Sequence, residues 1–343
     1  MITTKSETWI IGLLSLCLAA CGSSTSSGGD EPPVPVPIGF SADILRQEGV
    51  QTRGEVITDI SDMYVFASFT GANNWSPTNT PNFMYKQLME KAVDGEWTYT
   101  PVRYWPSTRD KISFFAYAPA TLTGIVAATA DKQGPQLTYT LPVTETAKQD
   151  LLASSCLDRT SGSGAVAFTM KHALTQVKFK IKNNEAATID AVLTGLEILM
   201  PGSGTLSFRD AATSTSSGKT FAWGTYGAQT TLTADALLGG GKTITLDGTS
   251  KEAATFFLLP LGDPSSLVTL RLTYTSRRTS PAEEPVTFIV PMSPPATPAW
   301  EAGTSISYEI SVRDDRLEVE EVTSISDFTE GSTGVTGGDI TAT

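Results

Sequence analysis

The 343-residue sequence has little of the chemistry that enzymes and metal proteins use. It contains one histidine, His172, and three cysteines, Cys17, Cys21 and Cys156. A Ser-His-Asp triad would depend on His172, and a zinc site would need carboxylates for most of its ligands. No motif nominates a carboxylate pair for glycoside hydrolysis. We therefore expect no enzyme, no cofactor and no metal site, and we interpret His172 as a side chain packed at a strand end or short turn.

Basic residues are also scarce. The chain has 24 Lys and Arg against 36 Asp and Glu, a formal net charge of −12. Such a surface repels a phosphate backbone, so we exclude nucleic acid as a partner. Charged residues make up only 17% of the chain, with 40% hydrophobic residues, 29 Gly and 20 Pro. This composition favours a β protein rich in turns over a helical one.

Long hydrophobic runs are absent except for Trp9–Ala20, which is shorter than the roughly 20 apolar residues of a membrane-spanning helix. The run follows Lys5 and ends in Leu-Ala-Ala-Cys at positions 18–21, which resembles the bacterial lipobox. It predicts a lipoprotein signal peptide over 1–20 and lipid on Cys21. The alternative is a secretory peptide that ends near a cysteine by chance.

Residues 21–37 have the composition of a flexible tether. A Gly/Ser stretch, 22–29, precedes Pro-Pro-Val-Pro-Val-Pro at 32–37, which favours an extended spacer. With Cys21 acylated, Cys156 has no partner for a disulfide. We interpret Cys156 as a small buried residue and not as a nucleophile, because no base is available to activate it.

The first strand predicted after the tether ends at Leu45-Arg46. Its apolar residues alternate with small or polar ones and share one face: Ile38, Phe40, Ala42 and Ile44. A polar stretch, 47–54, follows and contains Arg53.

Other short apolar runs between turn residues predict further strands, and no sustained helical period appears. They lie at 63–69, 97–105, 112–118, 177–182, 243–246, 255–261, 268–274, 286–290, 306–312 and 317–322. Residues 150–158 and 170–175 read as short turns with some helical character, separated by a Ser-Gly-Ser-Gly linker at 161–164. We place a domain boundary there, giving an N-terminal domain over 38–160, a C-terminal domain over 161–330 and a tail over 331–343.

Four tryptophans allow two interpretations. Trp75, Trp97, Trp105 and Trp223 could stack on sugar rings at a surface, as in a glycan-binding protein, or pack in the core as most strand aromatics do.

A series of landmarks resembles the fimbrillin family, the Mfa-like lipoproteins that are subunits of the type V pili of Bacteroidia. They are Tyr-Trp-Pro at 104–106, Phe-Phe-Ala-Tyr-Ala-Pro at 114–119, Asp-Leu-Leu-Ala at 150–153, the stretch from Phe168 to Leu174, and Val-Lys-Phe at 177–179. The closing signature is Trp-Glu-Ala-Gly at 300–303, followed by Tyr-Glu-Ile at 308–310. Phe328 departs from the tryptophan of many relatives.

The resemblance implies a way of assembling. In fimbrillins a lipoprotein precursor is cut by an arginine-specific protease, its first strand leaves, and a strand of another subunit fills the groove. By resemblance, the removable strand carries Ile38, Phe40, Ala42 and Ile44, and Arg46 or Arg53 is the cleavage site. The donor-strand candidates are Val319, Val322, Ile325 and Phe328. The tail at 331–343 is either part of the donor or simply frayed.

We therefore predict an all-β protein with two tandem Greek-key, transthyretin-like β-sandwich domains after the signal peptide and tether. The predicted function is that of a stalk or tip subunit of a type V pilus in cell adhesion or biofilm formation, first an outer-membrane lipoprotein and then part of the surface fimbrium. Its partners are other pilus subunits, in a homo- or hetero-polymer, and the maturation protease. The alternatives are a pilus anchor subunit and a monomeric, glycan-binding surface lipoprotein.

Overall fold

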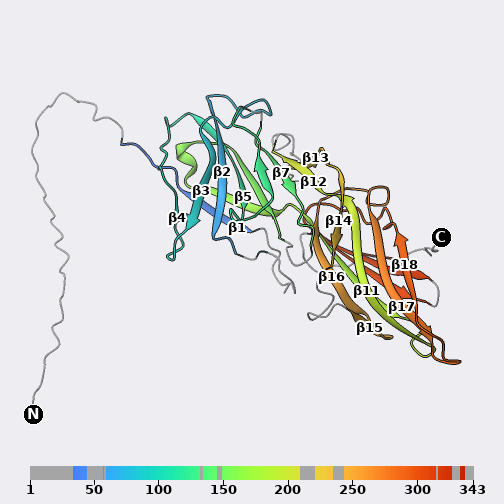
Figure 1. Ribbon diagram of the computed structural model, residues 1–343. Coiled ribbons are helices and arrows are strands. Elements are labelled where there is room, and N and C mark those ends of the chain that lie inside the picture. The colour runs from blue at the N-terminus through green and yellow to red at the C-terminus, as the bar shows by residue number, and fades with distance from the viewer. Residues whose placement is uncertain are drawn as a thin grey trace, which may run out of the picture. The chain divides into compact units, whose positions relative to one another are not determined.

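The computed structural model describes residues 34–44, 57, 59–131, 134–144, 149–208, 221–234, 243–313, 316–326 and 333–336 (Figure 1). Their regular structure is almost entirely β-strand, with one 3₁₀ turn at Ser161–Ser163. This confirms the all-β prediction. Within these ranges, no helix is long and apolar enough to cross a membrane.

Four sheets contain the strands. The strands of the first half are β1 (Phe40–Ile44), β2 (Asp62–Gly71), β3 (Met84–Lys91), β4 (Trp97–Thr98), β5 (Lys111–Ala118), β6 (Ile125–Ala127), β7 (Gln136–Thr140), β8 (Leu152–Arg159) and β9 (Val166–His172). Those of the second half are β10 (Thr175–Asn183), β11 (Ile189–Pro201), β12 (Ser203–Ser207), β13 (Ala222–Gly224), β14 (Gln229–Thr233), β15 (Ile244–Leu246), β16 (Lys251–Leu258), β17 (Thr269–Arg278), β18 (Val286–Met292), β19 (Thr304–Val312), β20 (Leu317–Ser326) and β21 (Thr333–Thr336).

The largest sheet has the order β1-β9-β8-β5-β2-β3-β4. Its central strand β5 is apolar on both faces, because successive side chains of a strand point to opposite sides. Phe114 joins the hydrophobic cluster on one face of the sheet, and Phe115 joins the cluster on the other. Both faces are therefore covered, which explains why the run 112–118 does not alternate with polar residues.

The other sheets have the orders β16-β10-β19-β20-β21, β14-β11-β17-β18 and β13-β12-β7-β6, with β15 paired to β11. In β10 the buried residues Val177, Phe179 and Ile181 alternate with half-buried Lys178, Lys180 and Lys182. This confirms the strand predicted at 177–182, whose lysines alternate with the buried apolar residues.

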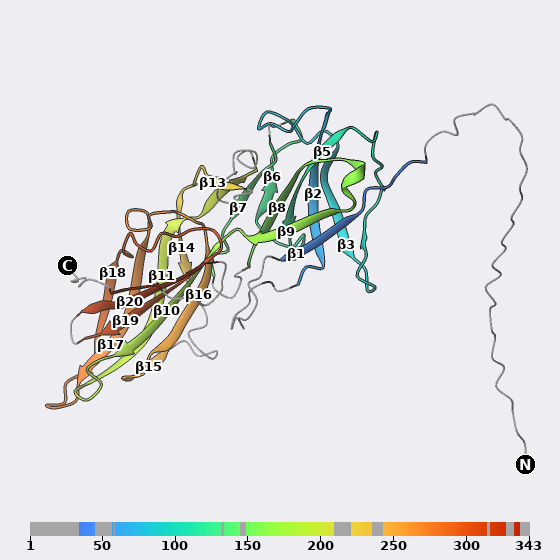
Figure 2. The same cartoon turned by 180° about the vertical axis from the view of Figure 1, so that it is seen from behind.

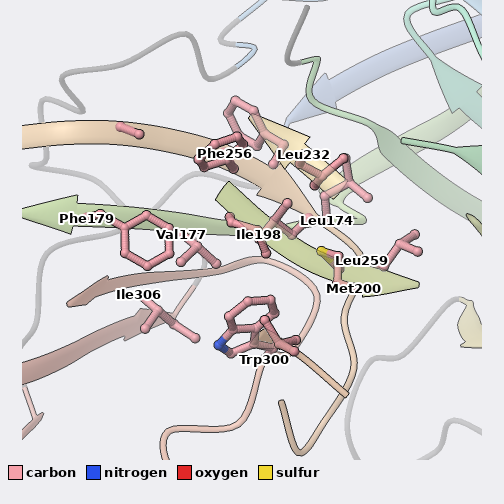
Figure 3. Close-up of a cluster of buried hydrophobic side chains, with 14 of the residues drawn as sticks. Leu174, Val177, Phe179, Ile198, Met200, Leu232, Phe256, Leu259, Trp300 and Ile306 are labelled. Atoms are coloured by element: carbon pink, nitrogen blue, oxygen red, sulfur yellow. The ribbon is translucent and has the colours of Figure 1, made fainter. Parts of the chain in front are cut away.

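A buried tryptophan organises the core beneath β10 and β19 (Figure 3). Trp300 has no exposed surface, and its Nε1–H donates to the hydroxyl of Tyr308, 2.8 Å away. The ring of Tyr308 stacks on Phe179 with centroids 5.6 Å apart. Trp300 and Tyr308, one from each part of the closing signature, thus hold the start of β19 against β10.

Three sequence-based predictions about elements were wrong. The run 97–105 forms a strand only at Trp97–Thr98, and Pro101 lies in the remainder, where it offers no N–H for a ladder. The predicted turns at 150–158 and 170–175 are largely strands β8 and β9. These segments are strands because they pair with other strands of the sheet, and their own residues show no alternation that would predict it.

The expected linker at 161–164 joins β8 to β9 inside one sheet. The chain leaves the largest sheet for good between β9 and β10, at Ala173 and Leu174, but β6 and β7 of the first half already belong to the sheet of β12 and β13. The division into two domains, with its boundary at the 161–164 linker, stays a prediction. The Greek-key, transthyretin-like arrangement likewise stays a prediction.

Candidate assembly site

The first strand, β1, lies at the edge of the largest sheet (Figure 2). It pairs in parallel with β9, from Phe40 opposite Val166 to Ile44 opposite Met170. Parallel pairing is slightly less stable per residue than antiparallel pairing. A short parallel edge strand is therefore an element that the sheet can lose without breaking its centre.

The predicted apolar face of this strand is the face that packs. Ile38, Phe40 and Ala42 are buried, and Ile44 is half-buried. Gly39 and Asp43 belong to the other face of the strand and are exposed. A fully buried Ile or Phe side chain contributes about 1.5–3 kcal/mol, so these side chains and not the short ladder supply most of the hold on β1.

Phe40 sits among three aromatic rings from different parts of the chain. Its centroid lies 5.3 Å from that of Tyr99 and 5.6 Å from that of Phe114, both in edge-to-face geometry. It also stacks on Phe168 of β9 at 6.3 Å. These are favourable aromatic geometries, so Phe40 is the main anchor of the strand.

The segment before β1 is held by a second neighbour. Ile38 N–H donates to the carbonyl of Arg103, and Trp105 N–H donates to the carbonyl of Val36, each at 2.9 Å. The hydroxyl of Tyr99 donates to the carbonyl of Ile38, also at 2.9 Å. The residues Val36–Ile44 therefore contact β9 at one end and the segment 103–105 at the other.

Three predicted sites lie outside the described residues: lipidation at Cys21 and cleavage at Arg46 or Arg53. Phe328, one of the donor-strand candidates, lies outside them as well. Ile325 is within β20, where its backbone pairs with Ser305.

The other two donor candidates fill the core of their own chain. Val319 and Val322 are buried in β20, which pairs with β19. A bulge in this pairing leaves Glu320 as an extra residue, and its carboxylate lies 2.5 Å from Lys182 Nζ of β10. Hydrogen bonds that Lys182 donates to Glu309 and Glu320 raise the pKa of this lysine.

His172, at the end of β9, is packed as the sequence predicts. It is 7% exposed, and its Nδ1 lies 2.7 Å from Oδ2 of Asp150. The other oxygen of Asp150 accepts the N–H of Leu151 at 2.8 Å, and Oδ2 also accepts the N–H of Ile57 at 3.4 Å. Asp150 thus holds two backbone N–H groups and the imidazole ring, which gives His172 a structural role.

We expect Asp150→Asn to lower the free energy of unfolding by about 2 kcal/mol, because the amide leaves one buried donor without an acceptor. Urea denaturation monitored by tryptophan fluorescence measures the change. Asp43→Asn is the matched control, since Asp43 is exposed, and should stay within about 0.5 kcal/mol of the native chain. Equal stability of both variants would contradict the structural role of Asp150.

Cys156 lies half-buried in β8, and its Sγ–H donates to the carbonyl of Ala167 at 2.9 Å. Burial raises the pKa of this thiol to about 11. At neutral pH the group is therefore protonated and a poor nucleophile.

This pKa predicts slow alkylation. The experiment uses residues 22–343, in which Cys156 is the only cysteine. The rate of its alkylation by iodoacetamide at pH 8 should be about 100-fold lower in the folded chain than in the urea-unfolded chain. The raised pKa also means that the folded-state rate keeps increasing toward pH 11. Mass spectrometry of time points gives both rates, and equal rates at pH 8 would refute the protected thiol.

The proposed sugar-binding tryptophans are not exposed platforms. Trp75 and Trp105 are buried, and Trp97 is half-buried against the cluster around β1. Trp223 is half-buried and donates its Nε1–H to the carbonyl of Ala173 at 2.6 Å. Of the two interpretations, packing within the fold therefore holds for Trp75 and Trp105, and Trp97 and Trp223 are only partly accessible.

Two further residues of the site escaped the sequence reasoning. Tyr99 and Phe168 surround Phe40 but lie far from it along the chain, and their strand-like surroundings gave no sign of this neighbour. Over the described part of the chain, no group of three His, Cys, Asp or Glu side chains could hold a metal ion.

The sequence profile of the fimbrillin-like family matches residues 56–327. The chain is also 34% identical to the fimbrium subunit Fim1C of Phocaeicola vulgatus over 187 residues, which are 47% of this chain and 48% of that protein. The match thus spans about half the length of this relative.

A crystal structure of a fimbrial protein from Bacteroides vulgatus has a similar fold. It aligns with a TM-score of 0.61 and 19% sequence identity, covering 85% of this chain and 99% of the other. At this identity the likeness shows the fold alone. The family profile, by contrast, matches most of the length of the chain. The chain therefore belongs to the fimbrillin-like family.

Proposed function

We propose that this chain is a structural subunit, stalk or tip, of a type V pilus, and that it assembles after proteolysis removes β1. The observation that carries the proposal is the geometry of β1: an edge strand with a buried apolar face, anchored through Phe40. Its departure would leave the backbone edge of β9 without a partner and an apolar trough beneath it. Such an edge is a template for strand addition.

The wider cellular role follows from the same proposal. The precursor reaches the outer membrane through lipid on Cys21 and becomes part of a surface fimbrium in adhesion or biofilm formation. Its partners are other pilus subunits and an arginine-specific protease that cuts at Arg46 or Arg53. Membership of the fimbrillin-like family and the similarity to a fimbrium subunit support these roles.

The test is the N-terminus of the protein recovered from the cell surface, determined by intact mass and terminal peptides. We expect a start at Gln47 or Gly54. Arg46→Lys and Arg53→Lys keep the charge but remove the arginine, so the variant that stops processing identifies the cleavage site. It should also prevent the formation of high-mass oligomers.

A lipidated start at Cys21 in the surface form, with no oligomers, would contradict a polymerising subunit and favour the pilus anchor. The glycan-binding alternative has less to support it, since Trp75 and Trp105 are buried and Trp97 and Trp223 are half-buried. We do not retain it as a second candidate function.

A further inference from the structure

The space that β1 occupies, which we call the β1 slot, has two backbone edges and one deep aromatic position. One edge is β9 from Val166 to Met170, and the other is the segment 103–105. The aromatic position is bounded by the rings of Tyr99, Phe114 and Phe168.

The β1 slot sets chemical requirements on whatever strand fills it. Side chains two residues apart in an extended strand share a face, so the neighbours of Phe40 on the buried face are Ile38 and Ala42. Both are buried in a cluster of apolar side chains. A filling strand therefore needs a large ring at the central position and uncharged residues two places before and after it, because an ionised group there would lose its water.

The C-terminal tail of this chain does not meet these requirements. Its sequence after Ser326 has a single aromatic residue, Phe328, and a carboxylate two residues later, Glu330. In an extended strand of either direction these two side chains share a face. Placing Phe328 in the aromatic position therefore puts Glu330 at the place of Ile38 or Ala42.

Registers that place another tail residue in the aromatic position fail differently, because Phe328 is the only ring after Ser326. Ile340 and Ala342 are two residues apart and apolar, but Gly338 then takes the place of Ile38 and no ring fills the aromatic position. Moreover, Thr333–Thr336 already forms β21, which pairs with Glu321–Ser324 of β20 in the same chain. Two copies of the chain are also both acidic and repel one another.

We infer that the β1 slot accepts a strand from a different protein, so that this chain joins a heteropolymer and not a polymer of its own copies. The partner supplies an extended apolar segment with an aromatic side chain at the place of Phe40 and uncharged residues two places to either side. This inference rests on the proposed function, in which β1 leaves.

The test uses the full mature chain with a recognition sequence for a site-specific protease inserted between positions 50 and 51. After cleavage, labelled synthetic peptides compete for the β1 slot, and fluorescence anisotropy gives their affinities. The peptides are residues 35–46, the same peptide with Phe40→Ala or Asp43→Ala, the tail 326–343, and the tail with Glu330→Ala. Asp43 is exposed in β1, so its substitution is the matched control.

We expect the 35–46 peptide to bind, Asp43→Ala to bind within about threefold of it, and Phe40→Ala to bind about 100-fold more weakly. The native tail should bind at least about 100-fold more weakly than the 35–46 peptide, and Glu330→Ala should improve it by about tenfold. The cleaved chain alone should stay monomeric in size-exclusion chromatography with light scattering.

Binding of the native tail within tenfold of the 35–46 peptide, or polymerisation of the cleaved chain alone, would overturn the inference. A different result identifies failure of the proposed function. If even the 35–46 peptide does not bind after cleavage, the β1 slot takes no strand at all, and both the function and the inference fall.

Discussion

Replacing Phe40 by alanine should release the first strand. The substitution removes a ring that contacts Tyr99, Phe114 and Phe168, and we expect it to lower the free energy of opening β1 by about 3 kcal/mol. Hydrogen exchange of the amides of β1 should then speed up by about 100-fold, while those of the central strand β5 change little. Mass spectrometry of peptic fragments after exchange measures both.

Asp43→Ala is the matched control on the exposed face of the same strand and should leave exchange within about threefold of the native rate. Phe40→Leu keeps an apolar side chain and should fall between the two. If Phe40→Ala and Asp43→Ala exchange alike, Phe40 is not the anchor, and the hold on β1 must come from its backbone pairing.

Replacing Trp300 by alanine should have the largest effect on global stability. The side chain is fully buried beneath β10 and β19, and truncation of such a ring costs about 4 kcal/mol. Its backbone exchanges two hydrogen bonds with Gly262, which the substitution leaves in place. Urea denaturation followed by far-ultraviolet circular dichroism measures the change.

Tyr308→Phe separates packing from hydrogen bonding at this position. It keeps the ring that stacks on Phe179 but removes the acceptor of the Trp300 Nε1–H, which should cost about 1–2 kcal/mol. Trp300→Phe, which keeps an apolar ring, should remain folded even where the alanine variant does not. A loss below about 1 kcal/mol in Trp300→Ala would contradict the central role of this side chain.

The strands that the sequence predicted well have one covered and one solvated face. β10 and β19 are examples at 177–182 and 306–310, where buried apolar residues alternate with partly exposed polar ones. The apolar face of β1 was predictable for the same reason: Ile38, Phe40 and Ala42 are spaced by two. By contrast, β8 is flanked by β5 and β9, and its buried start, Leu152–Ser154, has no alternation from which a strand could be recognised.

The candidate site was predictable in part. The anchor strand came from local periodicity and from the resemblance of short landmarks to a family. The aromatic rings that receive Phe40 were not predictable, because Tyr99, Phe114 and Phe168 come from three separate segments. The pairing of Asp150 with His172 was hidden in the same way, since 22 residues separate them.

The linear order of residues was thus sufficient for the β class, the acidic surface and the apolar face of the first strand. These properties depend on composition and on the two-residue repeat of an extended chain. Tertiary structure decided which edge β1 occupies, which rings receive Phe40, and that the tryptophans face inward. Those outcomes depend on contacts between segments distant in the chain, for which no local pattern carries a signal.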